Sequence, residues 1–240
     1  MDEARRLLDF PGLLNARDLG GYPTLDGAST RFRSLLRADD LVQLTPDGVQ
    51  ALAAFGVETV VDLRWPEEVT ASPSPLPRDL QHVRYEQISL LSGSATEWLA
   101  LTTDCPKELF KCAVLDHARA ELRDVLGVIA AASPGPLLFH CVAGKDRTGV
   151  IAALLLAVSD VEPDAIACDY AASTERLREA YLQRYAQLDA AEILEALRCP
   201  EEGVHNMLGH LEGLGGVRTY LAQIGLNDSE VARLRARLRD

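Results

Sequence analysis

Residues 136–158 read PLLFHCVAGKDRTGVIAALLLAV, and this stretch decides the fold. Its first residues, Pro136–Phe139, form an apolar run typical of a buried strand, and Val150–Val158 form a second run typical of a buried helix. The segment between the two runs contains Gly144. A strand that enters a short glycine-containing loop and leaves it as a helix directs main-chain N–H groups and the positive end of the helix dipole toward one point. The stretch therefore predicts an anion-binding loop in an α/β fold.

Two side chains in this loop predict a reaction at the anion site. Cys141 lies at the loop entrance, and a thiol beside a helix N-terminus ionises more readily than a free thiol. Arg147 follows six positions later, and its planar guanidinium can bind two oxygens of a phosphate while the sulfur faces the phosphorus. The spacing Cys-x5-Arg followed by Thr therefore predicts phosphoryl transfer to cysteine.

The segment His140–Gly149 also carries a family resemblance. Its pattern, His-Cys-x-x-Gly-Lys-Asp-Arg-Thr-Gly, resembles the signature of the cysteine-dependent protein tyrosine phosphatase superfamily. The Lys-Asp pair before the arginine is similar to the bacterial tyrosine/serine phosphatase branch, with atypical, dual-specificity and lipid-directed activity. Two further stretches resemble the same family: Asn15–Gly21, and an Asp-Leu-Arg-x-x-x-Glu element to which we assign Asp62, Arg64 and Glu67.

The resemblance implies a fold and its organisation. We expect an α/β, protein tyrosine phosphatase-like fold, in which a central, mostly parallel sheet is flanked by helices. A helical cap or lid is expected as an insertion after the phosphate-loop helix. One domain should span residues 1–240, with the cap at about 163–210. The alternative for that region is a set of helices packed permanently on the sheet.

The site residues follow from the loop chemistry together with the resemblance. Cys141 is the expected nucleophile, and Arg147 should hold the phosphoryl oxygens. Asp146 is the expected general acid, by analogy with phosphatases that carry their acid inside the loop. The other expected site residues are Val142, Ala143, Gly144, Lys145 and Thr148, as phosphate ligands, and His140 and Asp62, as supporting side chains.

Several roles within the site have alternatives. Asp146 could serve only to hold Arg147 or Lys145 in place. Asp62, Asp104 or Asp116 could then supply the proton to the leaving oxygen. The hydroxyl of Thr148 is expected to be a hydrogen-bond partner of the catalytic sulfur, and His140 is expected to hydrogen-bond the loop backbone. Lys145 should add a flexible positive charge that could meet a second phosphate, or else be merely solvated. This chemistry requires no cofactor and no metal ion.

Composition excludes several classes of protein. The chain has 240 residues, 48% of them hydrophobic, and its formal net charge of −12 gives no support to nucleic-acid binding. Its five cysteines are odd in number and lack Cys-x-x-Cys spacing, which argues against a disulfide framework and a zinc site. No signal peptide or membrane anchor is recognisable. We therefore expect a cytoplasmic enzyme that acts on a phosphorylated protein or a phosphoinositide. Signal-independent secretion and the oligomeric state stay open.

Local patterns predict the elements around the loop. Thr45 should cap a helix that ends at Gly56, and strands are expected at 59–64 and 82–88. A proline-rich surface excursion is expected at 71–78, one long helix at 108–132, and a capping box at Asn227 that starts the last helix. A helical tract at 163–197 should have a buried face made of Tyr170, Leu177, Tyr181, Tyr185 and Leu188. Arg17 and Asp18 should form a salt-bridged brace near the site.

Two other functions fit parts of the sequence. A rhodanese-like sulfurtransferase also uses a cysteine loop, but the Asp146-Arg147-Thr148 sequence and the helix after it suit phosphate better. A phospho-binding module that has lost turnover would use the same anion site. Because both Cys141 and Arg147 are present, nothing in the sequence favours this third function.

Overall fold

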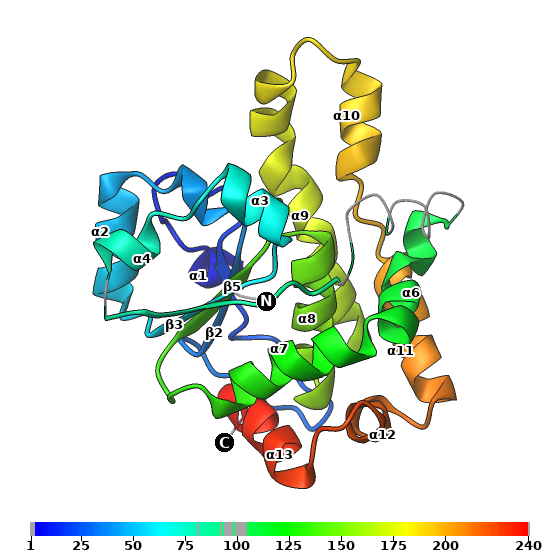
Figure 1. Cartoon of the computed structure of the whole chain (residues 1–240). Coiled ribbons are helices and arrows are strands. Elements are labelled where there is room, and N and C mark those ends of the chain that lie inside the picture. Colours follow the sequence, from blue (N-terminus) through cyan, green and yellow to red (C-terminus); the bar gives the residue numbers. More distant parts are fainter. Residues whose placement is uncertain (1–2, 81, 92, 94–97, 99–104, 240) are drawn as a thin grey trace.

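The central sheet has five strands in the order β1-β2-β5-β3-β4 in a computed structural model of the chain (Figure 1). The structure describes residues 3–80, 82–91, 93, 98 and 105–239. The strands are β1 (Arg17–Asp18), β2 (Leu35–Ala38), β3 (Thr59–Asp62), β4 (Arg84–Gln87) and β5 (Leu137–His140). β1 is antiparallel to β2, and all other neighbours are parallel. The expected α/β fold with a mostly parallel sheet is confirmed.

The three central strands end together at one edge of the sheet. β2, β3 and β5 are buried along their whole length, as their apolar sequences predict. Ala38 of β2 and Asp62 of β3 both pair in register with His140, the residue before Cys141. The residues that follow these strands therefore lie beside the loop, at the sheet edge where sites of α/β proteins collect.

Helices cover both faces of the sheet (Figure 1). On one face, α2 (Pro46–Phe55) and α4 (Leu76–Asp79) pack on the sheet through an apolar cluster that includes Leu52 and Leu138. On the other face, α8 (Asp146–Val158) is packed among α7 (Arg119–Ala131), α9 (Pro163–Arg184) and α13 (Asp228–Leu238). Because α8 is apolar on almost every side, its stable position is the centre of the larger core.

The remaining helices lie at the ends of the chain and around α8 and α9. Figure 1 shows that the far half of α9 and α10 form a hairpin projecting from the body of the molecule. Among the described residues, no helix is long and apolar enough to cross a membrane. The bounds of these helices are α1 (Glu3–Arg6), α3 (Pro66–Ala71), α6 (Phe110–His117), α10 (Ala190–Leu197), α11 (Glu202–Gly213) and α12 (Val217–Gln223), with 3-10 turns at Leu41–Gln43 and Lys107–Leu109.

Local capping signals were predicted correctly. Thr45 Oγ1 accepts a hydrogen bond from Gly48 N at 3.1 Å, and Gly56 ends α2 with a φ of +87°. Asn227 and Glu230 form the expected capping box of α13. These signals depend only on neighbours in sequence, so tertiary packing does not change them.

Three predictions about helices were wrong. The single helix at 108–132 is two helices, α6 and α7, because the backbone leaves helical geometry at the buried Ala118. The excursion at 71–78 contains the start of α4, since proline is tolerated in the first turn of a helix. Tyr185 and Leu188 lie beyond the end of α9 and are 36% and 54% exposed, so they do not continue its buried face.

Candidate active site

The loop between β5 and α8 requires glycine at one position, where the backbone approaches β2 closely. Gly144 has a φ of +63°, in the left-handed region. A Cβ atom there would lie 2.4 Å from the carbonyl oxygen of Ala38, at the end of β2. Glycine therefore allows the loop to pack directly against β2. Cys141 opens the loop and is buried.

The main-chain carbonyl groups of the loop are held from outside it. Each carbonyl from residue 141 to residue 145 accepts a hydrogen bond, and most of the donors are distant in sequence. The donors are His140 Nδ1 to Cys141 O (3.2 Å), Asp40 N to Val142 O (2.9 Å), Asn15 Nδ2 to Ala143 O (3.0 Å), Arg37 Nη2 to Gly144 O (2.7 Å) and Gly149 N to Lys145 O (2.7 Å).

The N–H groups of the same peptides are left for a ligand. Within the described part of the chain, the N–H groups of residues 142–146 have no hydrogen-bond acceptor. In a trans peptide the N–H points away from the carbonyl, so carbonyls held outward turn these donors toward the centre of the loop. The first N–H groups of α8 and its dipole add to them. The loop is a cradle of N–H donors for an oxyanion.

Arg147 is fixed at the rim of this cradle by residues that follow β3. Glu68 of α3 accepts from Arg147 Nη1 at 2.6 Å and from Nη2 at 2.9 Å. The Arg147 guanidinium also lies over the Trp65 ring, 4.4 Å from its centroid. Burial acts to lower the pKa of Arg147, but Cys141 and Glu68 outweigh it and hold that pKa above its ordinary value. These contacts leave two donors of Arg147 for a ligand, the Nε–H and one Nη2–H. Both lie on the same edge of the planar guanidinium.

A buried ionic cluster supports the loop from behind. Asp169 of α9 accepts from Arg17 Nε at 2.7 Å, from Tyr22 Oη at 2.8 Å and from Arg37 Nη1. Burial would raise the pKa of Asp169, but Arg17 and Arg37 hold it well below its ordinary value. The expected brace at Arg17 thus exists, but its partner is Asp169. Asp18 instead accepts hydrogen bonds from main-chain N–H groups.

Asp146 lies between the loop and α9. Its Oδ1 accepts from Tyr170 Oη at 2.9 Å, and its Oδ2 is 3.5 Å from Lys145 Nζ. Lys145 is buried, and its Nζ donates to Ala196 O at 2.7 Å, at the end of α10. The expectation of a flexible or solvated Lys145 was wrong, because α10 holds this side chain in place.

Comparisons with known proteins show the family of this chain. A profile described as "Tyrosine phosphatase family" matches residues 8–240. The chain belongs to this family. The phosphatase is 34% identical over 218 residues to a tyrosine-protein phosphatase of Nostoc commune, across 85% of this chain and 74% of the relative. It is 26% identical over 273 aligned positions to the triple specificity protein phosphatase PtpB of Mycobacterium tuberculosis, across 95% of this chain and 97% of the relative. The solved structure of P. aeruginosa TpbA aligns with a TM-score of 0.38 at 20% identity, across 69% of this chain and 86% of that one.

Family membership defines the class of reaction. The protein is a cysteine-based phosphatase, and so a phosphoric monoester hydrolase. Neither sulfur transfer nor a non-catalytic phospho-binding role is favoured by these relatives. The resemblance found in the sequence is confirmed.

A cavity lies beside the loop of the phosphatase, and its described lining residues include neither Cys141 nor Arg147. It has a volume of about 430 Å³ and lies between the loop and the α9–α10 hairpin. Its loop side carries Lys145 and Asp146, and its hairpin side is largely apolar. The lining residues are Ala143, Lys145, Asp146, Tyr181, Tyr185, Leu188, Glu192, Ile193, Ala196 and Leu197.

The supporting residues of the phosphatase lie on the other side of the loop. His140 donates to the loop backbone as expected, and its Nε2 is 3.7 Å from Asp62 Oδ2. Asp62 is fully buried and accepts from Arg64 Nη2 at 2.6 Å and from the hydroxyl of Tyr85. Burial would raise the pKa of Asp62, but Arg64 and His140 hold it below its ordinary value. A buried carboxylate with these partners is a structural ion pair, so we do not assign Asp62 as the acid.

The other expected partners do not gather at the loop. Thr148 Oγ1 is buried and has no hydrogen-bond partner among the described residues, so the expected bond to the catalytic sulfur is not formed. Asp116 of α6 pairs with His210 Nε2 of α11 at 2.9 Å. Asp104 lies outside the described residues.

Sequence reasoning missed several residues that shape this site. Glu68, rather than Glu67, binds Arg147, and the spacing Asp-Leu-Arg-x-x-x-Glu in fact places its glutamate at position 68. Asn15 was part of the family resemblance but had no role assigned to it. Arg37 and Asp169 gave no signal at all, because their contacts join segments 132 residues apart.

Proposed function

We propose that this phosphatase hydrolyses phosphotyrosine through a phosphocysteine intermediate on Cys141. The observation that carries the proposal is the loop itself, in which outward carbonyls leave five N–H groups, those of residues 142–146, around a buried cysteine. Such fixed donors stabilise the charge that spreads over three equatorial oxygens during phosphoryl transfer. The N–H of Thr148 in the first turn of α8 extends this donor set.

The first step transfers the phosphoryl group to sulfur. The Cys141 thiolate attacks phosphorus as the bond from phosphorus to the tyrosine oxygen breaks, and Arg147 binds two equatorial oxygens through its free edge. Asp146 lines the cavity on the loop side and gives its proton to the leaving oxygen.

The second step regenerates the enzyme. Water attacks the phosphocysteine, the Asp146 carboxylate takes a proton from that water, and the phosphorus–sulfur bond breaks to release phosphate and thiolate. Arg147 and the N–H groups carry the charge in both steps, so we infer that neither a metal ion nor a cofactor takes part. A thiolate nucleophile also requires a reducing compartment, which supports action in the cytoplasm.

The cavity supports phosphotyrosine as the main substrate. Tyr181, Tyr185 and Leu188 offer apolar and aromatic surface next to the loop, where a phenyl ring gains from burial. Phosphoserine, phosphothreonine and phosphoinositides are further candidates, since the relative from M. tuberculosis is named a triple specificity phosphatase. We infer that the α9–α10 hairpin is the expected cap, because Leu177, Ile193 and Leu197 form a small apolar cluster separate from the main core.

Phosphate release in EDTA tests the proposal. The substrates are a phosphotyrosine peptide, a phosphoserine peptide and a soluble phosphoinositide, with wild type compared with Cys141→Ser and Asp146→Asn. We expect turnover by wild type and none by Cys141→Ser. Asp146→Asn should lose more activity on alkyl phosphates than on activated aryl phosphates, because only a poor leaving group needs the proton. Full activity in Cys141→Ser would refute the mechanism. Equal losses of Asp146→Asn on alkyl and aryl phosphates would show that Asp146 is not the general acid.

A further inference from the structure

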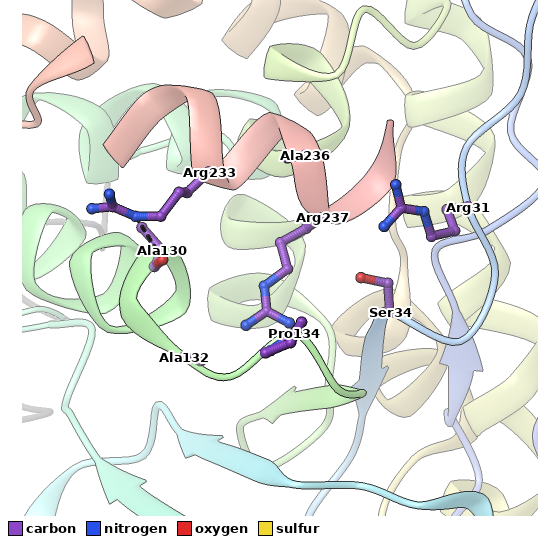
Figure 2. A pocket seen from close by; sticks show the side chains of 8 residues that line it. All are labelled: Arg31, Ser34, Ala130, Ala132, Pro134, Arg233, Ala236 and Arg237. Carbon is purple, nitrogen blue, oxygen red and sulfur yellow. Dashed lines mark hydrogen bonds between the residues drawn. The ribbon is translucent and has the colours of Figure 1, made fainter. Parts of the chain in front are cut away.

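A second cavity lies at the opposite end of the sheet from the phosphate loop, and Figure 2 shows the residues that line it. Ser34 comes directly before β2 and Pro134 shortly before β5, whereas the loop follows β5. The cavity has a volume of about 260 Å³, and three arginines are among the described residues that line it. Its lining residues are Arg31, Ser34, Ala130, Ala132, Pro134, Arg233, Ala236 and Arg237.

Two arginines of α13 bring charge to this cavity that no described carboxylate neutralises. Figure 2 shows Arg233 and Arg237 descending from α13, with Arg31 and Ser34 on the other side of the opening. Arg237 is buried and donates to the carbonyls of Gly135 (2.9 Å) and Ile129 (3.4 Å). Arg233 donates to Ala130 O at 3.1 Å and to a serine hydroxyl of its own helix. Among the described residues, neither guanidinium has a carboxylate within salt-bridge distance.

Two arginines outside the cavity lining have carboxylate partners. Arg235 of α13 is 2.9 Å from Asp160 Oδ2, and Arg239, which follows the helix, is 2.5 Å from Asp26 Oδ2. Arg233 and Arg237 instead donate to carbonyl groups and, in the case of Arg233, to the Ser229 hydroxyl. A carbonyl satisfies one N–H of a guanidinium but does not offset its charge, and each guanidinium carries five N–H donors.

The Ser34 side chain adds a hydroxyl to the cavity wall. Ser34 is 3% exposed as a residue, and its side chain faces the cavity. A hydroxyl can donate to an anion while the guanidinium groups bind its other oxygens, so one ligand would contact both groups.

We propose that this cavity binds a tetrahedral oxyanion, either free phosphate or the phosphate end of a small phosphomonoester. Its volume is below the roughly 300–1,000 Å³ typical of sites for drug-sized ligands, which favours a compact group. Arginine forks match the oxygen spacing of phosphate. The Glu58 carboxylate accepts from Ser133 Oγ at 2.5 Å and acts electrostatically on Arg237 from outside the lining.

Calorimetric titration with sulfate, phosphate and glycerol phosphate tests the site in an Arg147→Ala background, which removes the guanidinium of the phosphate loop. Saturable binding is expected. Adding Arg233→Gln or Ser34→Ala should weaken it, by about tenfold for the arginine, the effect of one charge-assisted hydrogen bond. Arg235→Gln makes the same change of charge on the same helix outside the cavity, and it should leave binding within about twofold. Glu58→Gln should tighten binding. Glycerol phosphate binding more tightly than free phosphate would assign the ester as the ligand class.

Two outcomes would overturn the proposal. These are no saturable binding in the Arg147→Ala protein, or equal weakening by Arg235→Gln and Arg233→Gln. Exchanging the buried Arg237 would destabilise the fold, so the test uses no Arg237 variant. Amide chemical shifts at 130–136 and 233–237 locate the bound anion in every variant that folds.

Discussion

Asp169→Asn should destabilise the phosphatase far more than any exchange of an exposed carboxylate. The side chain is 2% exposed, and it is the only described carboxylate that pairs with Arg17 and Arg37. Asparagine keeps the size of the residue but leaves two buried guanidinium groups without a counter-charge. Removing one partner of a buried ion pair costs about 3–5 kcal/mol of unfolding free energy. With a urea m-value of about 3 kcal/mol per M, the unfolding midpoint should fall by about 1–1.7 M.

The matched control is Asp160→Asn, which removes a 34% exposed carboxylate from Arg235 and Arg218. Its cost should stay below about 1 kcal/mol. The pKa of Asp169 is lowered in the folded state, so its stabilising effect is present above the ordinary value of 3.8 and is lost as the pH falls below it. The difference between wild type and Asp169→Asn should therefore shrink in acid. Equal midpoint shifts for the two variants at neutral pH would refute the argument.

Three further predictions concern the site and its surroundings. Glu68→Gln should lower kcat/KM by about 10- to 100-fold by releasing Arg147, whereas Glu67→Gln, on the exposed neighbour, should not, and similar losses in both would contradict the role of Glu68. Vanadate should slow tryptic cleavage within 178–198 in wild type but not in Arg147→Ala if the α9–α10 hairpin closes over a bound oxyanion; unchanged cleavage would mean a fixed hairpin. Burial lowers the pKa of Lys111 to about 8, so the unfolded chain binds the extra proton and stability should rise between pH 8 and 10.5 relative to Lys111→Met; parallel pH curves would exclude this.

The phosphate loop was predictable because its determinants are contiguous. A strand, a glycine, a cysteine and an arginine at fixed spacing identify the loop in the sequence, although Asn15 and Arg37 help to hold its shape. The caps of α2 and α13 were predictable for the same reason. Each of these features is decided within about ten residues, a range over which local sequence controls the backbone.

Other features depend on segments that meet only in the folded chain. No glycine or proline marks the break at Ala118, so local sequence could not separate α6 from α7. The buried face of α9 was extended past the end of the helix to Tyr185, because periodicity alone does not show where packing stops. The contacts of Lys145 could not be foreseen, since its partner Ala196 lies 51 residues away on another helix.

The outward carbonyls of the phosphate loop have a consequence for how the enzyme matures. Asn15 reaches Ala143 across 128 positions of sequence, and Arg37 reaches Gly144 across 107. The signature segment therefore has no stable shape of its own, and a peptide with its sequence would not be a phosphate receptor. Catalytic competence must arrive late in folding, after the first third of the chain has packed against the loop in the middle third. A partly folded or truncated chain that keeps its helices and core would still lack the ordered N–H donors around Cys141.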